Sequence, residues 1–227
     1  MNALVMYDHQ TDTLWSQFVG EAVDGPLNGT ELELLPSRLT TMGEWVREHP
    51  DTLLLERGLL GAAFYPYQGY YMEPSSGILG EANRDDRLDQ KALIVGVTTE
   101  TAQKAYPFSA IDDVGTLNVI FQDLDLVLFT NTSGDGINVN EGGGSDSRGG
   151  AVEVFDRTVG GRTLNFKQFE DLYAFDIETR STWDKRTGVA VTGELEGQQL
   201  TPIPSFLAFW FGWSDFYPDT EVYEPDS

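Results

Sequence analysis

The sequence predicts a mainly β protein: an antiparallel meander or barrel-like lobe with few short helices and an internal duplication of a hairpin motif that carries tryptophan and glycine. Three observations predict it. Segments with strand-like composition fill much of the chain after its first third. Helical periodicity is confined to a few short segments. A segment of 45 residues near the N-terminus also occurs again near the C-terminus.

The duplication relates residues 8–52, here called copy 1, to residues 176–220, called copy 2. The offset is 168 throughout, and 17 of 45 positions are identical, among them two tryptophans, three glycines and a closing Pro-Asp-Thr. Identity at such fixed positions indicates that one ancestral unit was copied.

Each copy is expected to start with a strand at TLW or STW whose ring lies on the buried face. A hairpin follows in residues 20–36 and 188–204, with a short strand, a glycine turn and a second strand that ends at proline. A short helical turn then leads into Pro-Asp. Both tryptophans of each copy are expected in the core, because buried tryptophan is normally architectural.

Between the copies, the sequence predicts a meander. ALIVGVTT and KAYPF form a strand pair, LNVIFQDLDLVLFTNT forms a strand, turn and strand, and Gly160-Gly161 joins the strands EVFDRTV and RTLNFKQ. Helical signals remain at TMGEWVREHP, at WFGWSDFYP and at the edges of TETAQKAYPFSAI. Residues 65–90 and 133–150 are predicted loops, rich in glycine with proline or acidic residues.

The position of the copies suggests the domain organisation. Copy 2 follows a β-rich region that starts near Tyr65, whereas only seven residues precede copy 1. Residues 1–56 are therefore expected to be the terminal motif of a first lobe, either truncated or packed on the second. Residues 57–227 are expected to form one complete lobe.

The charge is strongly negative. The chain carries 37 acidic against 14 basic residues, a net charge of −23. Such a surface repels nucleic acid and anionic lipid, so no nucleic-acid partner is expected. Acidic residues spread along the chain favour a halophilic source, because concentrated salt screens their repulsion. A calcium-rich or merely acidic environment is the alternative.

The sequence also lacks the residues and segments that several kinds of site and location require. There is no cysteine, hence no disulfide, zinc-thiolate site or thiol nucleophile. No segment approaches the length of a membrane-spanning helix. The N-terminal residues show no signal-peptide pattern, so a cytoplasmic location stays open.

No catalytic or cofactor-binding residue is predicted. The two histidines, His9 and His49, are replaced by Ile177 and Tyr217 in copy 2, and no G-x-S-x-G elbow is present, so surface or structural roles are expected. The repeated pairs Asp8/Asp176 and Asp51/Asp219 are expected to bind nearby backbone amides in turns and caps. The tyrosines of residues 65–71 are expected to pack on the sheet, with stacking on sugars or peptides as the alternative.

One oxygen-rich cluster is a candidate for weak binding of calcium or another cation: Asp135, Asn138, Asn140, Glu141 and Asp146. Its spacing does not fit the EF-hand loop, and a solvated loop is the alternative.

Three segments resemble the DUF3179 family, a domain of unknown function found in haloarchaea and some bacteria. They are YDHQTDTLWSQFVGEAVDGPLNGTELELLP with the following W and HPDT, then KAYPF, then VFDRTVGGRTLNF. The resemblance implies an extracytoplasmic or cell-surface setting, often with an upstream lobe. Many members carry a cysteine motif before the VFDR strand. Here that position is LVLFTNTSGDGINVNEGGG, so any role of that thiol is absent.

The resemblance implies no reaction, and three functions stay open. The first is a non-catalytic binding or structural module of a halophilic cell. The second is a carboxylate-dependent hydrolase with a groove between the copies, which requires two facing acids. The third is a subunit of a larger assembly completed by a neighbouring chain, which a bare apolar face around Leu4–Trp15 would favour.

Overall fold

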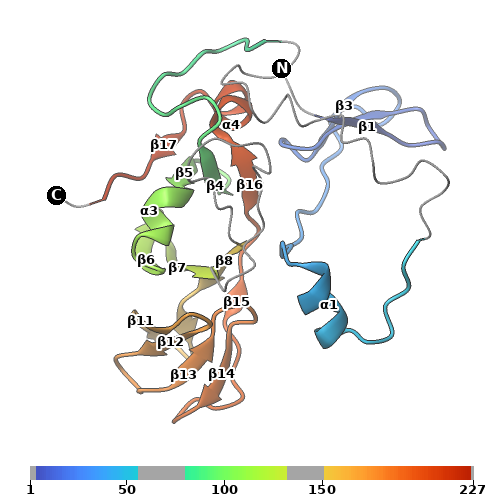
Figure 1. Ribbon diagram of the computed structural model, residues 1–227. Coiled ribbons are helices and arrows are strands. Elements are labelled where there is room, and N and C mark those ends of the chain that lie inside the picture. The colour runs from blue at the N-terminus through green and yellow to red at the C-terminus, as the bar shows by residue number, and fades with distance from the viewer. Residues whose placement is uncertain (1–3, 56–79, 132–150, 226–227) are drawn as a thin grey trace, which may run out of the picture.

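The computed structural model describes residues 4–55, 80–131 and 151–225. The mainly β class is confirmed. In the described residues the strands form five sheets, which are open and do not close into a barrel, and three short helices accompany them (Figure 1).

Two four-stranded sheets form most of what we call the body, residues 93–131 and 151–170. One has the order β16-β4-β5-β17 and the other β15-β8-β7-β6, so in each sheet strands from copy 2 or its C-terminal end complete the edges. The bounds are β4 Leu93–Thr98, β5 Gln103–Pro107, β6 Thr116–Phe121, β7 Leu124–Asn131, β8 Ala151–Asp156, β15 Thr201–Pro202, β16 Phe206–Phe209 and β17 Glu221–Val222.

The predicted strand pair and the strand-turn-strand are both confirmed, as β4-β5 and β6-β7. A short helix, α3 (Phe108–Asp112), follows β5 and buries Phe108 and Ile111. The Gly160-Gly161 hairpin is confirmed between β9 (Thr158–Val159) and β10 (Arg162–Thr163). The predicted strand EVFDRTV is divided, since β8 ends at Asp156 and β9 pairs only with β10.

Copy 2 forms three strands of a third four-stranded sheet, whose edge strand β11 (Phe166–Glu170) belongs to the body. These are β12 (Tyr173–Asp176), β13 (Thr182–Asp184) and β14 (Val189–Thr192), and helix α4 (Trp210–Phe216) closes the copy.

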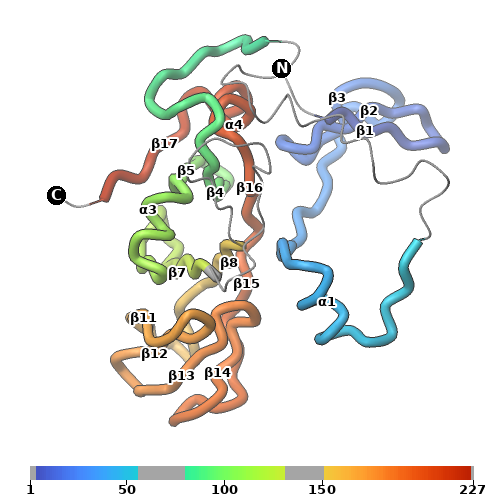
Figure 2. Tube along the Cα trace, in the orientation of Figure 1, coloured from blue at the N-terminus to red at the C-terminus, as the bar shows by residue number. Residues whose placement is uncertain are grey.

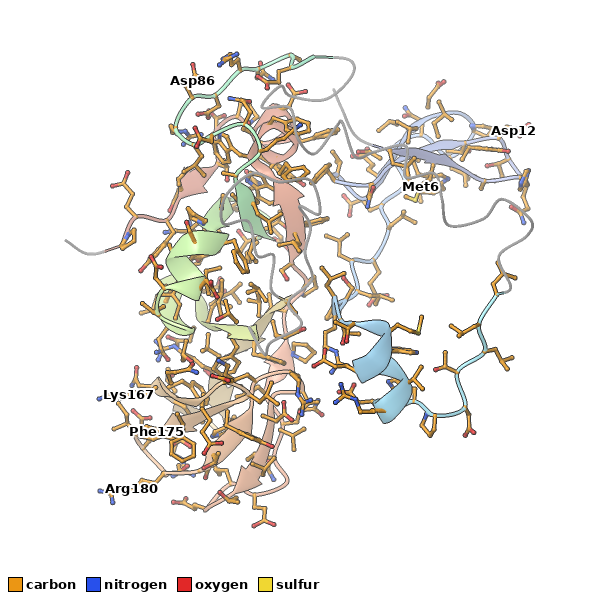
Figure 3. The ribbon with its side chains drawn as sticks, viewed as in Figure 1. Met6, Asp12, Asp86, Lys167, Phe175 and Arg180 are labelled. Atoms are coloured by element: carbon orange, nitrogen blue, oxygen red, sulfur yellow. The ribbon has the colours of Figure 1, made fainter. Side chains whose placement is uncertain are left out.

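Copy 1 and the residues just before it repeat this arrangement. Its elements are β1 (Val5–Tyr7), β2 (Leu14–Ser16), β3 (Glu21–Asp24) and α1 (Met42–Glu48). Each lies 168 residues before its counterpart in copy 2, allowing for the one extra residue of β12. The special backbone positions also match: Asp12 and Arg180, labelled in Figure 3, both have φ 55°. The predicted duplication is therefore also a structural one.

The backbone of the hairpin turn shows why glycine recurs. Gly25 and Gly193 have φ of 103° and 100°, and a Cβ there would lie 2.8 Å from Thr13 Cα and 2.5 Å from Ser181 Cα, respectively. Only glycine fits such an approach without strain.

The second arm of the predicted hairpin is wrong. After β3 and β14 the chain returns through one isolated bridge only, Glu21 to Glu31 and Val189 to Gln199. In copy 2 the next residues form β15, which pairs with β8 of the body instead. The hydrogen bonds of the returning arm itself stay within each copy: Ala22 N donates to the Thr30 carbonyl oxygen and Ala190 N donates to the Gln198 carbonyl oxygen, both at 2.9 Å.

The two copies lie side by side in opposite directions. Figures 1 and 2 show β1–β3 at the end of the molecule where α4 lies, and α1 at the level of β15. Contacts join them: the Phe18 ring packs against Phe206, Trp213 and Phe216 with centroid distances of 5.1–6.4 Å. The Tyr217 hydroxyl donates to the Phe18 carbonyl oxygen at 2.6 Å.

Candidate functional site

An aspartate at the start of each copy organises the turn that follows. Asp176 is buried and accepts hydrogen bonds from Thr179 Oγ1 at 2.7 Å and from Trp183 Nε1 at 2.9 Å. In copy 1, Thr11 Oγ1 donates to Asp8 at 2.8 Å and Trp15 Nε1 donates at 3.0 Å. These hydrogen bonds lower the pKa of Asp8, first among them the one from the Thr11 side chain. The turn role predicted for Asp8 and Asp176 is confirmed.

The surroundings of the two copies differ sharply. In copy 2, Trp183 and Leu200 lie in one core cluster with Phe129, Phe155 and Phe166 of the body. Trp210 and Trp213 lie in another cluster with Ile94 and Ala105 of the body. The second copy therefore closes both ends of the body's apolar core.

The corresponding side chains of copy 1 are open to solvent. Met6, Leu32, Met42 and Trp45 are 40%, 43%, 55% and 39% exposed, whereas Ala174, Leu200, Trp210 and Trp213 are at most 1% exposed. We call Met6, Leu32, Met42 and Trp45 the open face of copy 1. The expectation that all four tryptophans lie in the core is thus wrong for copy 1, where Trp15 is half-buried and Trp45 exposed.

Exposed large apolar residues concentrate in this part of the chain. Of 23 such residues in the described structure, 17 lie between Leu4 and Leu55. Leu53 and Leu55 are almost fully exposed, at 94% and 97%. Such a concentration of exposed apolar side chains makes this part of the chain the candidate interaction surface.

A second feature is a pocket of about 300 Å³ between the copies. The segment Pro36–Arg38 of copy 1 lines one side. Pro202, Ile203 and Ser205 of copy 2, which overlap the counterpart of this segment, line another side together with Arg186 and Glu153. A Pro-Ser pair is common to both copies at residues 36–37 and 204–205.

Among the residues that the structure describes, Glu153 is the only acidic one in the lining of this pocket. It is 9% exposed, and its Oε1 atom has no hydrogen-bond partner. Burial raises the pKa of Glu153 to about 8; the Arg38 guanidinium opposes this shift and the Glu48 carboxylate adds to it. Glu48 itself is paired with Arg38. Glu153 is therefore a neutral acid at neutral pH.

The raised pKa predicts a pH dependence of stability. The folded protein keeps a proton on Glu153 that the unfolded chain releases above pH 4.5. Its contribution is therefore complete below pH 4.5 and falls as the pH rises through about 8. The wild-type protein should lose about 3 kcal/mol of unfolding free energy through this group as the pH rises from ~5 to ~7.5, and the Glu153→Gln variant should not. Urea denaturation in constant salt measures both.

A matched control is provided by Lys185, whose pKa burial lowers to about 8. Lys185 changes the unfolding free energy with pH only above about pH 8, because the folded and unfolded side chains are both charged below that pH and the unfolded one stays charged up to about 10.5. Lys185→Met should therefore leave the slope between pH ~5 and ~7.5 unchanged. Equal slopes for wild type and Glu153→Gln would contradict the burial of a neutral Glu153.

The two histidines lie at the surface beside rings. The His9 ring lies 5.0 Å from Tyr7, and the His49 ring lies 4.1 Å from Trp45 at the end of α1. Neither lines the pocket between the copies.

The proposed cation cluster of Asp135, Asn138, Asn140, Glu141 and Asp146 lies outside the described residues, as do the tyrosines of residues 65–71. Within the described ranges, no group of three or more His, Asp or Glu side chains is arranged to hold a metal ion. Within the same ranges, no helix has the length and apolarity needed to cross a membrane.

Comparison with known proteins gives a family and nothing beyond it. No curated protein and no solved structure matches the chain. A family model described as "Protein of unknown function (DUF3179)" matches residues 1–220, which is almost the whole sequence. The chain therefore belongs to the DUF3179 family.

Proposed function

We propose that this protein is a non-catalytic binding module of a larger assembly, and that copy 1 binds a protein partner through its open face. One observation carries the proposal. The same structural unit occurs twice in one chain, covered by the body in copy 2 and uncovered in copy 1. The exposed apolar residues of copy 1 occupy the positions at which copy 2 packs against the body.

The open strand edges support the same proposal. In copy 2, β12 pairs with β11 and β16 pairs with β4. In copy 1, β1 pairs with β2 and with no other described strand, and residues 38–41, the equivalents of β16, form no strand. An exposed edge is a ready template for pairing with another chain.

The hydrolase hypothesis has less support. Two carboxyl groups must face each other across a scissile glycosidic bond. The pocket between the copies offers Glu153 alone, next to the positive side chains of Arg38 and Arg186.

We also propose a halophilic and surface-associated setting. The net charge of −23 and the distribution of acids along the chain support the first part. The resemblance of the N-terminal motif to exported family members supports the second.

The charge predicts salt-dependent folding. Transfer from molar salt to ~10 mM salt should abolish most far-ultraviolet circular dichroism, because the screening length grows from ~3 Å to ~30 Å and the acidic side chains repel each other. A control titration at pH ~4, where about half of the carboxylates are protonated, should show a weaker dependence on salt. An unchanged spectrum at neutral pH would count against halophily.

The binding role is tested by photo-cross-linking in the host cell. Benzoylphenylalanine at position 6, on the open face, is expected to yield a covalent adduct with another polypeptide segment. The matched control is position 120 on β6, because Ile120 is also exposed, at 66%, but lies outside copy 1. Adducts from neither position, or equally from both, would refute a specific partner at the open face.

A further inference from the structure

The contacts between the copies follow an approximate two-fold symmetry. Phe18 of copy 1 packs on Phe206 and Phe216 of copy 2. By the offset of 168 residues, Phe18 corresponds to Arg186. In the same way, Phe206 corresponds to Arg38 and Phe216 corresponds to Glu48. Arg186 lies 3.9 Å from Glu48 and lines the same pocket as Arg38. Phe18 of copy 1 thus contacts two residues of copy 2, and its counterpart Arg186 of copy 2 approaches the two equivalent residues of copy 1. Such reciprocal contacts are typical of an isologous pair, in which the same surface of each member faces the other.

This symmetry extends to the segments that line the pocket. Pro36 and Ser37 correspond to Pro204 and Ser205, and the two segments meet there. The opposite directions of the copies in Figure 1 fit the same relation. In the described structure, a body covers the side of copy 2 that faces away from copy 1, and no equivalent body covers copy 1. If a copy with its body is one unit, the described residues form one whole unit and the closing copy of a second.

From this relation we infer the partner of the open face: a second β body of the DUF3179 type, folded like residues 93–131 and 151–170 and lacking a closing copy of its own. The inference rests on the proposed function and names its partner. Copy 2 supplies the template, because each contact between copy 2 and the body predicts one between copy 1 and the partner.

The template gives the strand register. Gln168 and Lys167 of β11 pair with Ala174 and Phe175, so the partner's equivalent strand would pair with Met6 and Tyr7. Figure 3 labels Met6 on β1. The outer edge of the small sheet of copy 1 would thereby gain a fourth strand.

Two more segments would pair in the same way. Residues 206–209 pair with β4, so residues 38–41 would pair with its equivalent in the partner. Residues 221–222 pair in parallel with β5, so the exposed Leu53 and Leu54 would do the same.

The template also fixes one side chain of the partner. Gly96 of β4 lies directly against the Trp213 ring, where a Cβ would come within 2.2 Å of Cζ3. Trp45 is the counterpart of Trp213, and both indoles bind the closing threonine, Trp45 to Thr52 at 2.8 Å and Trp213 to Thr220 at 2.9 Å. The partner strand that pairs with residues 38–41 therefore carries glycine opposite Trp45.

A second copy of this chain does not fit as the partner. Its body is already closed by its own copy 2, which buries Trp183, Trp210 and Trp213 completely. To cover copy 1 of another molecule, this body would have to release all three rings.

The experiment supplies a body covalently and in register. Residues 80–172 are joined directly to Val5 of the full chain, so that the added body meets β1 through the same link that joins β11 to β12. Hydrogen exchange is measured by mass spectrometry over residues 5–8, 38–41 and 53–55. Exchange in these segments is expected to slow by at least about tenfold relative to the natural chain, with the fused protein monomeric in sedimentation.

The control carries Phe166→Asp in the added body only, because the Phe166 ring packs edge-on against Trp183 at 5.7 Å in the natural lobe. It should lose the protection of copy 1 and keep that of copy 2. Two results would overturn the inference: unprotected copy 1 segments in the fused chain, whether the added body folds or not, or a natural chain that self-associates and protects the open face. If position 6 still forms adducts in cells, the binding role survives and only this partner is rejected.

Discussion

Replacing Trp183 by alanine is expected to destabilise the protein by about 3–5 kcal/mol, whereas Trp15→Ala is expected to cost about 1 kcal/mol or less. Both indoles donate to an aspartate of their own copy, at 2.9 and 3.0 Å, so the lost hydrogen bond is the same. Only Trp183 is fully buried, against Phe166 and other residues of the body, and its removal leaves a cavity. The difference between the two variants therefore measures burial by the body.

The measurement is urea denaturation at molar salt, followed by circular dichroism, with the denaturant slope fitted for each variant. Trp183→Phe serves as a control that keeps most of the ring volume and loses the hydrogen bond, and it should fall between wild type and Trp183→Ala. Equal losses at positions 15 and 183 would show that copy 1 is covered in solution as copy 2 is.

The second large effect is expected from Gly96→Ala, which should destabilise the lobe by about 3 kcal/mol. Its Cβ would lie 2.2–2.6 Å from three atoms of the Trp213 ring. That ring is fully buried and held by its hydrogen bond to Thr220, so it has no room to move. Adding a methyl group in such a place forces β4 and α4 apart.

Gly43→Ala is the matched control. Gly43 lies in α1, and a Cβ there meets only Thr41 Oγ1, at 4.0 Å. Alanine should stabilise this helix by ~0.5–1 kcal/mol. In thermal melts at the same salt concentration, Gly96→Ala should lower the melting temperature and Gly43→Ala should raise it. An unchanged melting temperature for Gly96→Ala would contradict the close packing of Trp213 on β4.

The duplication made much of the fold predictable from sequence. Spacing alone predicted that residues 8–52 and 176–220 fold alike, because the glycines, the tryptophans and Pro-Asp-Thr are local requirements of turns and helix ends. The β4-β5 and β6-β7 pairs were predictable for the same reason, since short alternating strands around tight turns are specified by neighbouring residues.

The environment of each copy was not predictable in this way. Trp45 and Trp213 have the same local sequence signal, yet one is exposed and the other buried, because burial depends on strands far away in the chain. In copy 2 the predicted second strand of the hairpin is reduced to one bridge, and the residues that follow form β15, which takes its partner from β8. The pocket with Glu153 also escaped prediction, since a single glutamate in a strand carries no sign that a proline-serine segment will cover it.

The order of the segments along the chain sets a problem for biosynthesis. The body leaves the ribosome before copy 2, which must close it, but after copy 1, a similar closing unit. In a nascent chain, copy 1 could therefore pack on the body before copy 2 is synthesised. Misassembly of this kind is a characteristic failure of proteins with repeated domains. Divergence between the copies opposes it: Arg38 and Met42 stand where Phe206 and Trp210 fill the natural lobe. Differences between the copies at positions such as these therefore favour closure of the body by copy 2 over closure by copy 1.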